Sequence, residues 1–215
     1  MARIKNGILG GFSGKVGSVV GCRWKNIEYI RSLPAKPSGP PSEKQLAARA
    51  KFRFLNNWLN DKAAFFATSF INHTADITAM NAAYRFNKDA VAGVYPDFEL
   101  DYSRIVISRG ELPGAADARC VLAENNVLEF SWSPVLETGA RYDDLLAVLV
   151  CYHTGDFEYT LNGTERKAGH YTMPLQYAPA EGTAHVYLTF INNNRTLTAD
   201  SMRFEVEVEI KDGQE

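Results

Sequence analysis

Hydrophobic positions follow a helical period in the second quarter of this chain. In residues 42–60, apolar side chains recur every three or four positions and occupy more than one side of the predicted helix. Ser42 and Gln45 form a capping box, which predicts that this helix begins directly after Ser42. Two shorter helices are predicted over residues 62–70 and 79–86. A helix that is apolar on more than one side needs more than one neighbour, so we expect either a helical subdomain or a subunit interface.

From about residue 102 the period changes from 3.6 to 2, which predicts strands. Residues 202–210 alternate between apolar and charged side chains, so this strand should have one buried and one exposed face. Residues 145–153 are apolar on both faces, which indicates a central strand. The other strands are predicted at residues 104–108, 128–132, 157–161, 170–175 and 186–191. About seven strands predict an antiparallel immunoglobulin-like β-sandwich, and the fold class is therefore α+β.

The first 41 residues follow neither period. Glycines recur through residues 7–21, which favours tight turns and short extended pieces, predicted at residues 16–22 and 27–31. Four prolines in residues 33–41 predict a stiff, extended linker. The predicted domains are a glycine-rich extended arm with its linker (1–41), a helical segment (42–100) and the sandwich (101–215).

Charge is divided unevenly between the two ends of the chain. Residues 1–53 carry 11 Lys and Arg against 2 acidic residues, whereas residues 54–215 carry 12 against 23, giving +9 and −11. Such asymmetry indicates either a polyanion-binding arm or head-to-tail docking of unlike ends, unless these charges simply line a solvated surface. The candidate contacts for nucleic acid or a protein partner are Lys15, Arg23, Trp24, Lys25, Tyr29, Arg31, Arg49 and Arg53.

Patterns typical of catalysis and metal binding are missing from the sequence. The four histidines show no His-x-x-x-His spacing, and Cys22, Cys120 and Cys151 show no Cys-x-x-Cys spacing. Gly14-Lys15 is followed by Val16, which departs from the phosphate-binding loop. Neither a Rossmann fingerprint nor a Gly-x-Ser-x-Gly elbow occurs. We therefore expect no enzyme, no cofactor and no metal.

Three widely spaced cysteines fit a reducing compartment. The first residues lack the continuous apolar stretch of a signal peptide. No apolar run approaches the roughly 18 residues of a membrane-spanning helix. These features predict a cytoplasmic or virion protein that contacts no membrane.

Two parts of the chain resemble known families. Residues 6–17, Asn-Gly-Ile-Leu-Gly-Gly-Phe-Ser-Gly-Lys-Val-Gly, resemble an uncharacterised bacterial domain family, together with Trp24-Lys25, residues 29–32 and 42–45, and Arg-Ala-Lys-Phe at 49–52. The same plan is similar to proteins of phage and prophage structural regions, which implies a structural role by analogy. Residues 102–210 resemble fibronectin type III and related immunoglobulin-like modules, with a tryptophan in the second strand and a tyrosine in the penultimate one.

The sequence leaves three functional hypotheses open. The leading one is a non-enzymatic structural or assembly protein, a component of a phage-derived or virion-like particle. Its arm would engage a neighbouring subunit of a homo-oligomer or larger assembly. The second is a nucleic-acid-binding protein that uses the basic arm. The third is a sandwich module for glycan or protein, with candidate contacts at Tyr152, Tyr159, Tyr171 and Tyr187.

Overall fold

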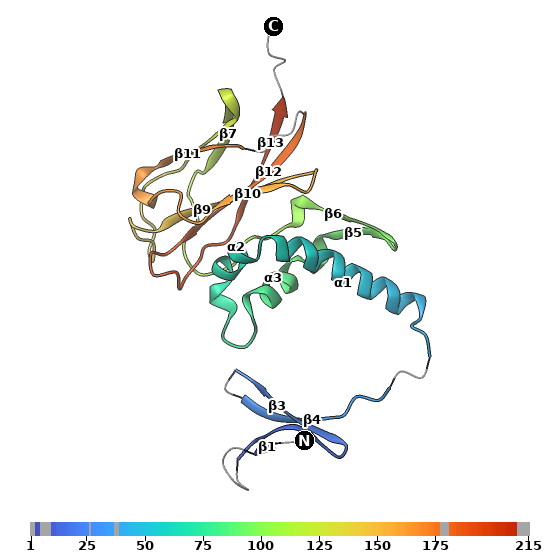
Figure 1. Ribbon diagram of the computed structural model, residues 1–215. Coiled ribbons are helices and arrows are strands. Elements are labelled where there is room, and N and C mark those ends of the chain that lie inside the picture. Colours follow the sequence, from blue (N-terminus) through green and yellow to red (C-terminus); the bar gives the residue numbers. More distant parts are fainter. Residues whose placement is uncertain (1–2, 5–9, 26, 37–38, 177–180, 210–215) are drawn as a thin grey trace. The chain divides into compact units, whose positions relative to one another are not determined.

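The computed structural model describes residues 3–4, 10–25, 27–36, 39–176 and 181–209. They form two compact units, Met1–Glu43 and Lys44–Glu215 (Figure 1). The three-part division expected from the sequence stays a prediction. Residues 6–9 of the N-terminal motif, and Ile210 of the last predicted strand, lie outside the described residues.

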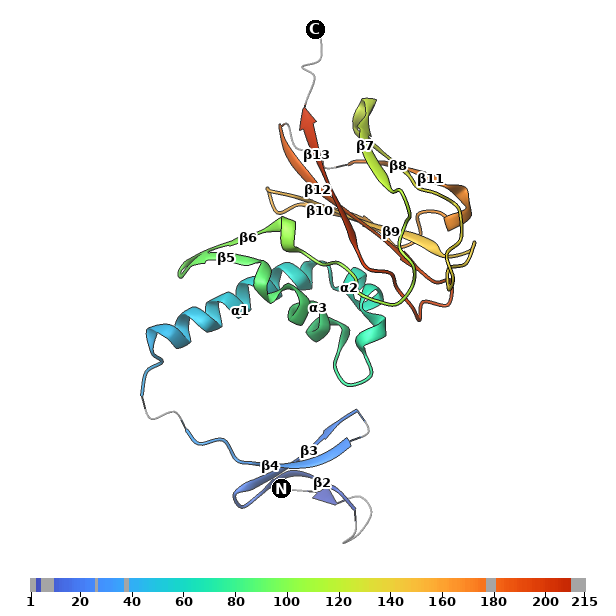
Figure 2. The same cartoon turned by 180° about the vertical axis from the view of Figure 1, so that it is seen from behind.

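The N-terminal unit is one antiparallel sheet with the strand order β1-β2-β3-β4 (Figure 2). The strands are β1 (Arg3–Ile4), β2 (Phe12–Val16), β3 (Val19–Trp24) and β4 (Ile27–Ser32). Strand β4 confirms the extended piece predicted at residues 27–31. The piece predicted at residues 16–22 was wrong, because a turn at Gly17 separates β2 from β3. Gly17 has a φ of +57°, a conformation that glycine adopts without steric cost.

The second unit opens with the three predicted helices. They are α1 (Glu43–Asp61), α2 (Ala63–Ser69) and α3 (Ala79–Asn87), followed by the hairpin β5 (Val91–Val94) and β6 (Asp97–Leu100). Helix α1 begins directly after Ser42, as predicted. Thr78 caps α3, because its hydroxyl accepts a hydrogen bond from the backbone N–H of Asn81 at 3.1 Å. Of the helices that the structure describes, none is long and apolar enough to cross a membrane.

Seven strands of the described chain form the predicted sandwich. They are β7 (Arg119–Ala123), β8 (Val127–Ser131), β9 (Leu145–Tyr152), β10 (Phe157–Thr160), β11 (His170–Pro174), β12 (Glu181–Ile191) and β13 (Met202–Glu209). One sheet has the order β10-β9-β12-β13 and the other β11-β8-β7, and all pairs are antiparallel. This is an α+β fold with an immunoglobulin-like sandwich.

Strand β9 is apolar on both faces because each face has its own covering layer. Leu146, Val148 and Val150 pack toward the opposite sheet. The alternate residues Ala147, Leu149 and Cys151 instead share a hydrophobic core with the three helices. Both views show α2 and α3 on the side of the four-stranded sheet away from β7, β8 and β11 (Figures 1 and 2). The prediction of a central strand is confirmed, and a helical layer explains its second apolar face.

The strand predicted at residues 104–108 was wrong. Ile105 and Ile107 are buried as a strand pattern would require, but Val106 has no strand partner. Its N–H donates to Oδ1 of Asn87, and its carbonyl accepts from Nδ2 of the same side chain, both at 2.8 Å. The buried amide side chain of Asn87 therefore supplies the hydrogen bonds that a neighbouring strand would otherwise give to the backbone of Val106. Strand β7 is the seventh strand of the sandwich in place of the predicted one.

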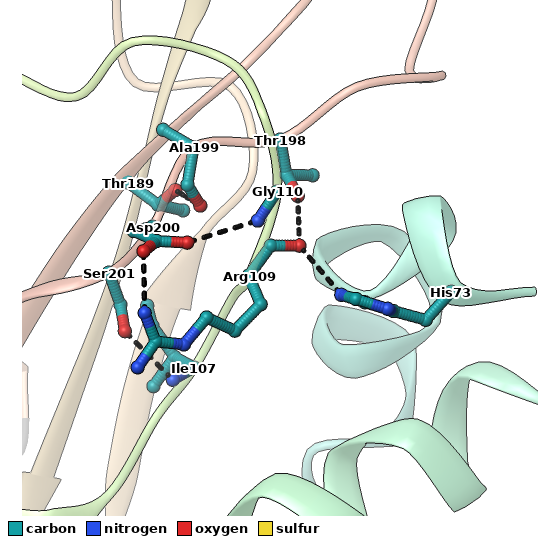
Figure 3. A network of polar contacts seen from close by, with 9 residues as sticks. All are labelled: His73, Ile107, Arg109, Gly110, Thr189, Thr198, Ala199, Asp200 and Ser201. Atoms are coloured by element: carbon teal, nitrogen blue, oxygen red, sulfur yellow. Dashed lines mark hydrogen bonds and ion pairs between the residues drawn. The ribbon is translucent and has the colours of Figure 1, made fainter.

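A polar network fastens this irregular segment to its surroundings (Figure 3). The carbonyl of Arg109 accepts from Nε2 of His73 and from the hydroxyl of Thr198, each at 3.2 Å. Asp200 accepts from the N–H of Gly110 at 3.1 Å and forms an ion pair with Arg109. Residues far apart in sequence, from the helical layer and from the β12–β13 connection, are thus joined through one backbone segment.

Candidate functional site

The N-terminal sheet has almost no core of its own. Gly21 alone is buried among the described residues of this unit, and every residue of β4 is exposed. Ile27 is 64% exposed and Ile30 is 63% exposed. A single sheet layer must cover an apolar face with another layer to be stable, and the described residues of this unit form one layer only.

Close approach between β2 and β3 makes Gly21 indispensable to this sheet. A Cβ added at Gly21 would lie 2.0 Å from the backbone oxygen of Phe12. Any larger residue must therefore push the two strands apart. The same substitution at Gly39, in the linker, meets no atom within 4 Å.

Strand register brings four of the candidate residues to one face of the sheet. Lys15 lies opposite Val20, and Val20 lies opposite Arg31. Cys22 lies opposite Tyr29, and Trp24 opposite Ile27. Directly opposite residues in antiparallel strands share a face. We call this the basic–aromatic face, and its members are Lys15, Val20, Cys22, Trp24, Ile27, Tyr29 and Arg31.

Arg23 and Lys25 lie apart from that face. Arg23 alternates with Cys22 and Trp24 along β3, so it belongs to the opposite face, where it is in register with Glu28. Its Nε donates to the carbonyl of Lys25 at 3.1 Å. Lys25 follows β3 with a φ of +51°, in the connection to β4. The sequence alone does not reveal this division of the charges, because it depends on where the turn falls.

Arg49 and Arg53 belong to the other compact unit. They lie one turn apart on exposed positions of α1, beside the exposed ring of Phe52. A shallow hollow on this helix is lined by Ala48, Arg49, Phe52, Arg53, Asn56 and Asn57. The structure therefore does not unite all eight predicted contact residues in one site.

Two histidines that the sequence separates by 32 positions meet in the structure. Nε2 of His153 lies 3.2 Å from Nε2 of His185, and the ring of Tyr102 stacks on His185 at 4.4 Å. Nδ1 of His185 lies 3.5 Å from Oε1 of Glu205. Burial lowers the pKa of His185, and His153 adds to that effect, so the imidazole is neutral at pH 7. The register of β9 with β12 could not be inferred before the sheet order was known.

Cys120 and Cys151 lack the surroundings of an activated nucleophile. Burial raises the pKa of Cys120 and of Cys151 to about 12, whereas reactive cysteines have a lowered pKa. In the part of the chain that the structure describes, no three His, Cys, Asp or Glu side chains gather as a metal centre requires.

The tyrosines proposed as sandwich contacts belong mainly to the core. Tyr152 and Tyr187 are fully buried, and their hydroxyl groups donate to Glu158 and to the carbonyl of Tyr102. Tyr171 is half-buried and stacks on Phe130. Tyr159 keeps an exposed ring. Of the four, one remains available to a glycan or a protein ligand.

Comparison with known proteins gives a family but no activity. A model described as "Family of unknown function (DUF6266)" matches residues 11–204. No curated protein matches this chain. A solution structure of the fn3 domain of the human collagen alpha-1(XX) chain is similar at 15% identity and a TM-score of 0.37, covering 48% of this chain and 91% of that domain. The sandwich itself is defined by its two sheets, with the strand orders β10-β9-β12-β13 and β11-β8-β7.

Proposed function

This chain belongs to DUF6266, a family of unknown function, and we propose that it is a non-enzymatic structural or assembly protein. Its N-terminal sheet engages a neighbouring subunit of a homo-oligomer or larger assembly. The exposed apolar surface of that sheet carries the proposal, because a layer with one buried residue among those described has little hydrophobic stabilisation of its own. The phage-like plan of residues 1–60 supports a phage-derived or virion-like particle, in the cytoplasm or in the virion.

Light scattering coupled to size-exclusion chromatography tests the assembly role. We expect the full-length protein to form an oligomer that the Gly21→Val variant loses, because a side chain at Gly21 collides with the backbone of β2. Gly39→Val introduces the same side chain where there is room, and it should assemble like the wild type. A wild-type protein that stays monomeric at high concentration would overturn the proposal.

Nucleic-acid binding is the second candidate, and one observation favours it. Lys15 and Arg31 share a face with Trp24 and Tyr29, so phosphates and bases could be bound together. Fluorescence anisotropy with a single-stranded oligonucleotide should then show an affinity that falls steeply with salt. Lys15→Ala should weaken binding, whereas Arg23→Ala, on the opposite face, should leave it unchanged. An affinity that changes neither with salt concentration nor with either substitution would eliminate this candidate.

A further inference from the structure

Strand β4 has one edge with no described strand of its sheet beside it. It is the last strand of that sheet, and Leu33, directly after it, donates its N–H to the carbonyl of Ser18 at 2.7 Å. Backbone groups alternate in direction along a strand, so those of Glu28, Ile30 and Ser32 point away from β3. An exposed edge of six residues is a template for the addition of another strand.

Large apolar side chains are exposed along this edge. Ile30 lies opposite Gly21 of β3, and a glycine has no side chain that could cover it. Ile27 and Leu33 are exposed on the other face of the strand. A strand added to the edge would place its own side chains against these three residues and remove apolar surface from water.

We propose that β4 pairs antiparallel with β4 of a second copy of this chain, about a two-fold axis at Ile30. The inference rests on the proposed assembly function and names the strand that performs it. In an antiparallel pair, the outward-pointing residues of one strand lie opposite those of the other, because they exchange the hydrogen bonds. Ile30 then faces Ile30 of the second copy, and Glu28 faces Ser32 on both sides of the axis.

The residues between these hydrogen-bonded pairs match as well. Arg31 lies opposite Tyr29 of the second copy, where a guanidinium can stack on an aromatic ring. Ile27 lies opposite Leu33 of the second copy, which joins two exposed apolar side chains. Each of these pairs occurs twice, because the two-fold axis repeats it. Cross-strand pairs of these kinds stabilise a sheet.

Hydrogen bonding allows other registers only in steps of two residues, and these registers match less well. One step sets Ile30 opposite Ser32 and places the two copies of Arg31 directly opposite each other, which is destabilising. The opposite step sets Ile30 opposite Glu28. It also sets Ile27 opposite Arg31. The register centred on Ile30 is therefore the favoured one, because it joins apolar side chains to each other and opposes no like charges.

Net charge does not forbid this contact, although both sheets are basic. Residues 1–43 carry seven Lys and Arg against two acidic residues, a net charge of +5. Strand β4 itself carries one charge of each sign, Glu28 and Arg31, and Arg23 of β3 is in register with Glu28. Lys15 of β2 would lie five strand spacings, about 24 Å, from Lys15 of the second copy. That separation exceeds the Debye length of about 8 Å at physiological salt, so this repulsion is screened.

Opposite charges at the two-fold axis test the contact in the full-length protein. Because Ile30 faces itself, Ile30→Lys and Ile30→Glu each place like charges directly opposite, and each variant should self-associate roughly 3- to 10-fold more weakly. In an equal mixture, the lysine of one variant faces the glutamate of the other, and association should return. Val16→Lys and Val16→Glu make the same changes at an exposed position of β2 and should assemble like the wild type.

The outcomes of sedimentation velocity separate the hypotheses. Loss in both Ile30 variants with recovery on mixing supports the symmetric β4–β4 contact. Loss without recovery, or loss in one variant alone, indicates that Ile30 meets a different surface and overturns the inference. A wild-type oligomer that neither variant affects also overturns it but leaves the assembly function standing. A monomeric wild type removes both.

Disulfide formation between two cysteine variants tests the register. Residues of a hydrogen-bonded pair have Cα atoms about 5.5 Å apart, which suits a disulfide. An oxidised mixture of Glu28→Cys and Ser32→Cys should therefore give a covalent dimer, with the link between positions 28 and 32 identified by peptide mapping. Either variant alone should give no link at its new cysteine, because the two copies of that position lie about 13 Å apart along the strands. A mixture without the 28–32 link, or a link within either variant alone, overturns the proposed pairing.

Discussion

Asp144→Ala should destabilise the second unit severely, because it leaves a buried guanidinium without its counterion. Both side chains of the Asp144–Arg166 pair are buried, with 0% of Asp144 and 4% of Arg166 exposed. Nε of Arg166 lies 3.1 Å from Oδ2 of Asp144. The other guanidinium nitrogens donate to the carbonyls of Gly114 and Pro113 at 2.6 and 2.7 Å. Burial lowers the pKa of Arg166 and Asp144 opposes that shift, yet a guanidinium stays charged at neutral pH. Breaking such a pair costs about 3–5 kcal/mol.

Equilibrium urea unfolding, followed by tryptophan fluorescence, measures this cost. Asp143→Ala, the same substitution one position earlier and half-buried, should cost less than about 1 kcal/mol. The double variant Asp144→Ala/Arg166→Met should regain part of the lost stability, since it removes the unpaired charge. If Asp144→Ala costs no more than the Asp143 control, the pair does not hold Gly114 and Pro113 to the sandwich, and the reasoning is refuted.

Three further variants test the buried polar groups. Burial lowers the pKa of Lys62 in the folded protein, so between the folded-state pKa and 10.5 the unfolded chain binds more protons than the folded one. The wild type should therefore gain stability relative to Lys62→Met as the pH rises toward 10.5. Urea unfolding at pH 7 to 10 checks this, and parallel profiles would contradict it. Burial lowers the pKa of His185 from 6.5 in the folded protein. The stability that its neutral imidazole contributes is therefore complete above pH 6.5, and it is lost as the pH falls through 6.5 toward the folded-state pKa. His185→Gln should therefore lose less stability than wild type between pH 7.5 and 5, and an equal loss would refute that reasoning. Asn87→Ala removes three hydrogen bonds of a fully buried side chain and should cost about 2–4 kcal/mol in thermal unfolding, whereas exposed Asn81→Ala on the same helix should cost under about 1 kcal/mol. Equal costs for the two asparagines would count against the role of Asn87.

Elements with a strong local pattern could be predicted from the sequence. Helix α1 starts directly after Ser42 because a proline-rich stretch and a capping box mark the same point. The alternation in residues 202–209 and the double apolar face of β9 both identified strands correctly. These signals are local, since each depends on neighbouring residues and on a single period.

Features that depend on distant partners escaped prediction. Residues 104–108 carry strand-like side chains, but the amide of Asn87 takes the place of a neighbouring strand. Strand β7 is short and was missed, although Asn125 and Asn126, both with positive φ, mark the turn that follows it. In the candidate site, the residue types were predictable and their faces were not. The turn at Gly17 sets the register that separates Arg23 from Lys15 and Arg31.

The helical layer over β9 has a consequence for synthesis. Phe65, Phe66 and Phe70 are fully buried in the finished protein, and part of their cover comes from Leu149 and Tyr187. A ribosome completes the helices well before it releases those strands, and folding proceeds from the N-terminal side during translation. The nascent chain must therefore carry an exposed aromatic cluster until β9 and β12 emerge. Ribosome-bound chains that end before residue 145 should bind chaperones that full-length chains release.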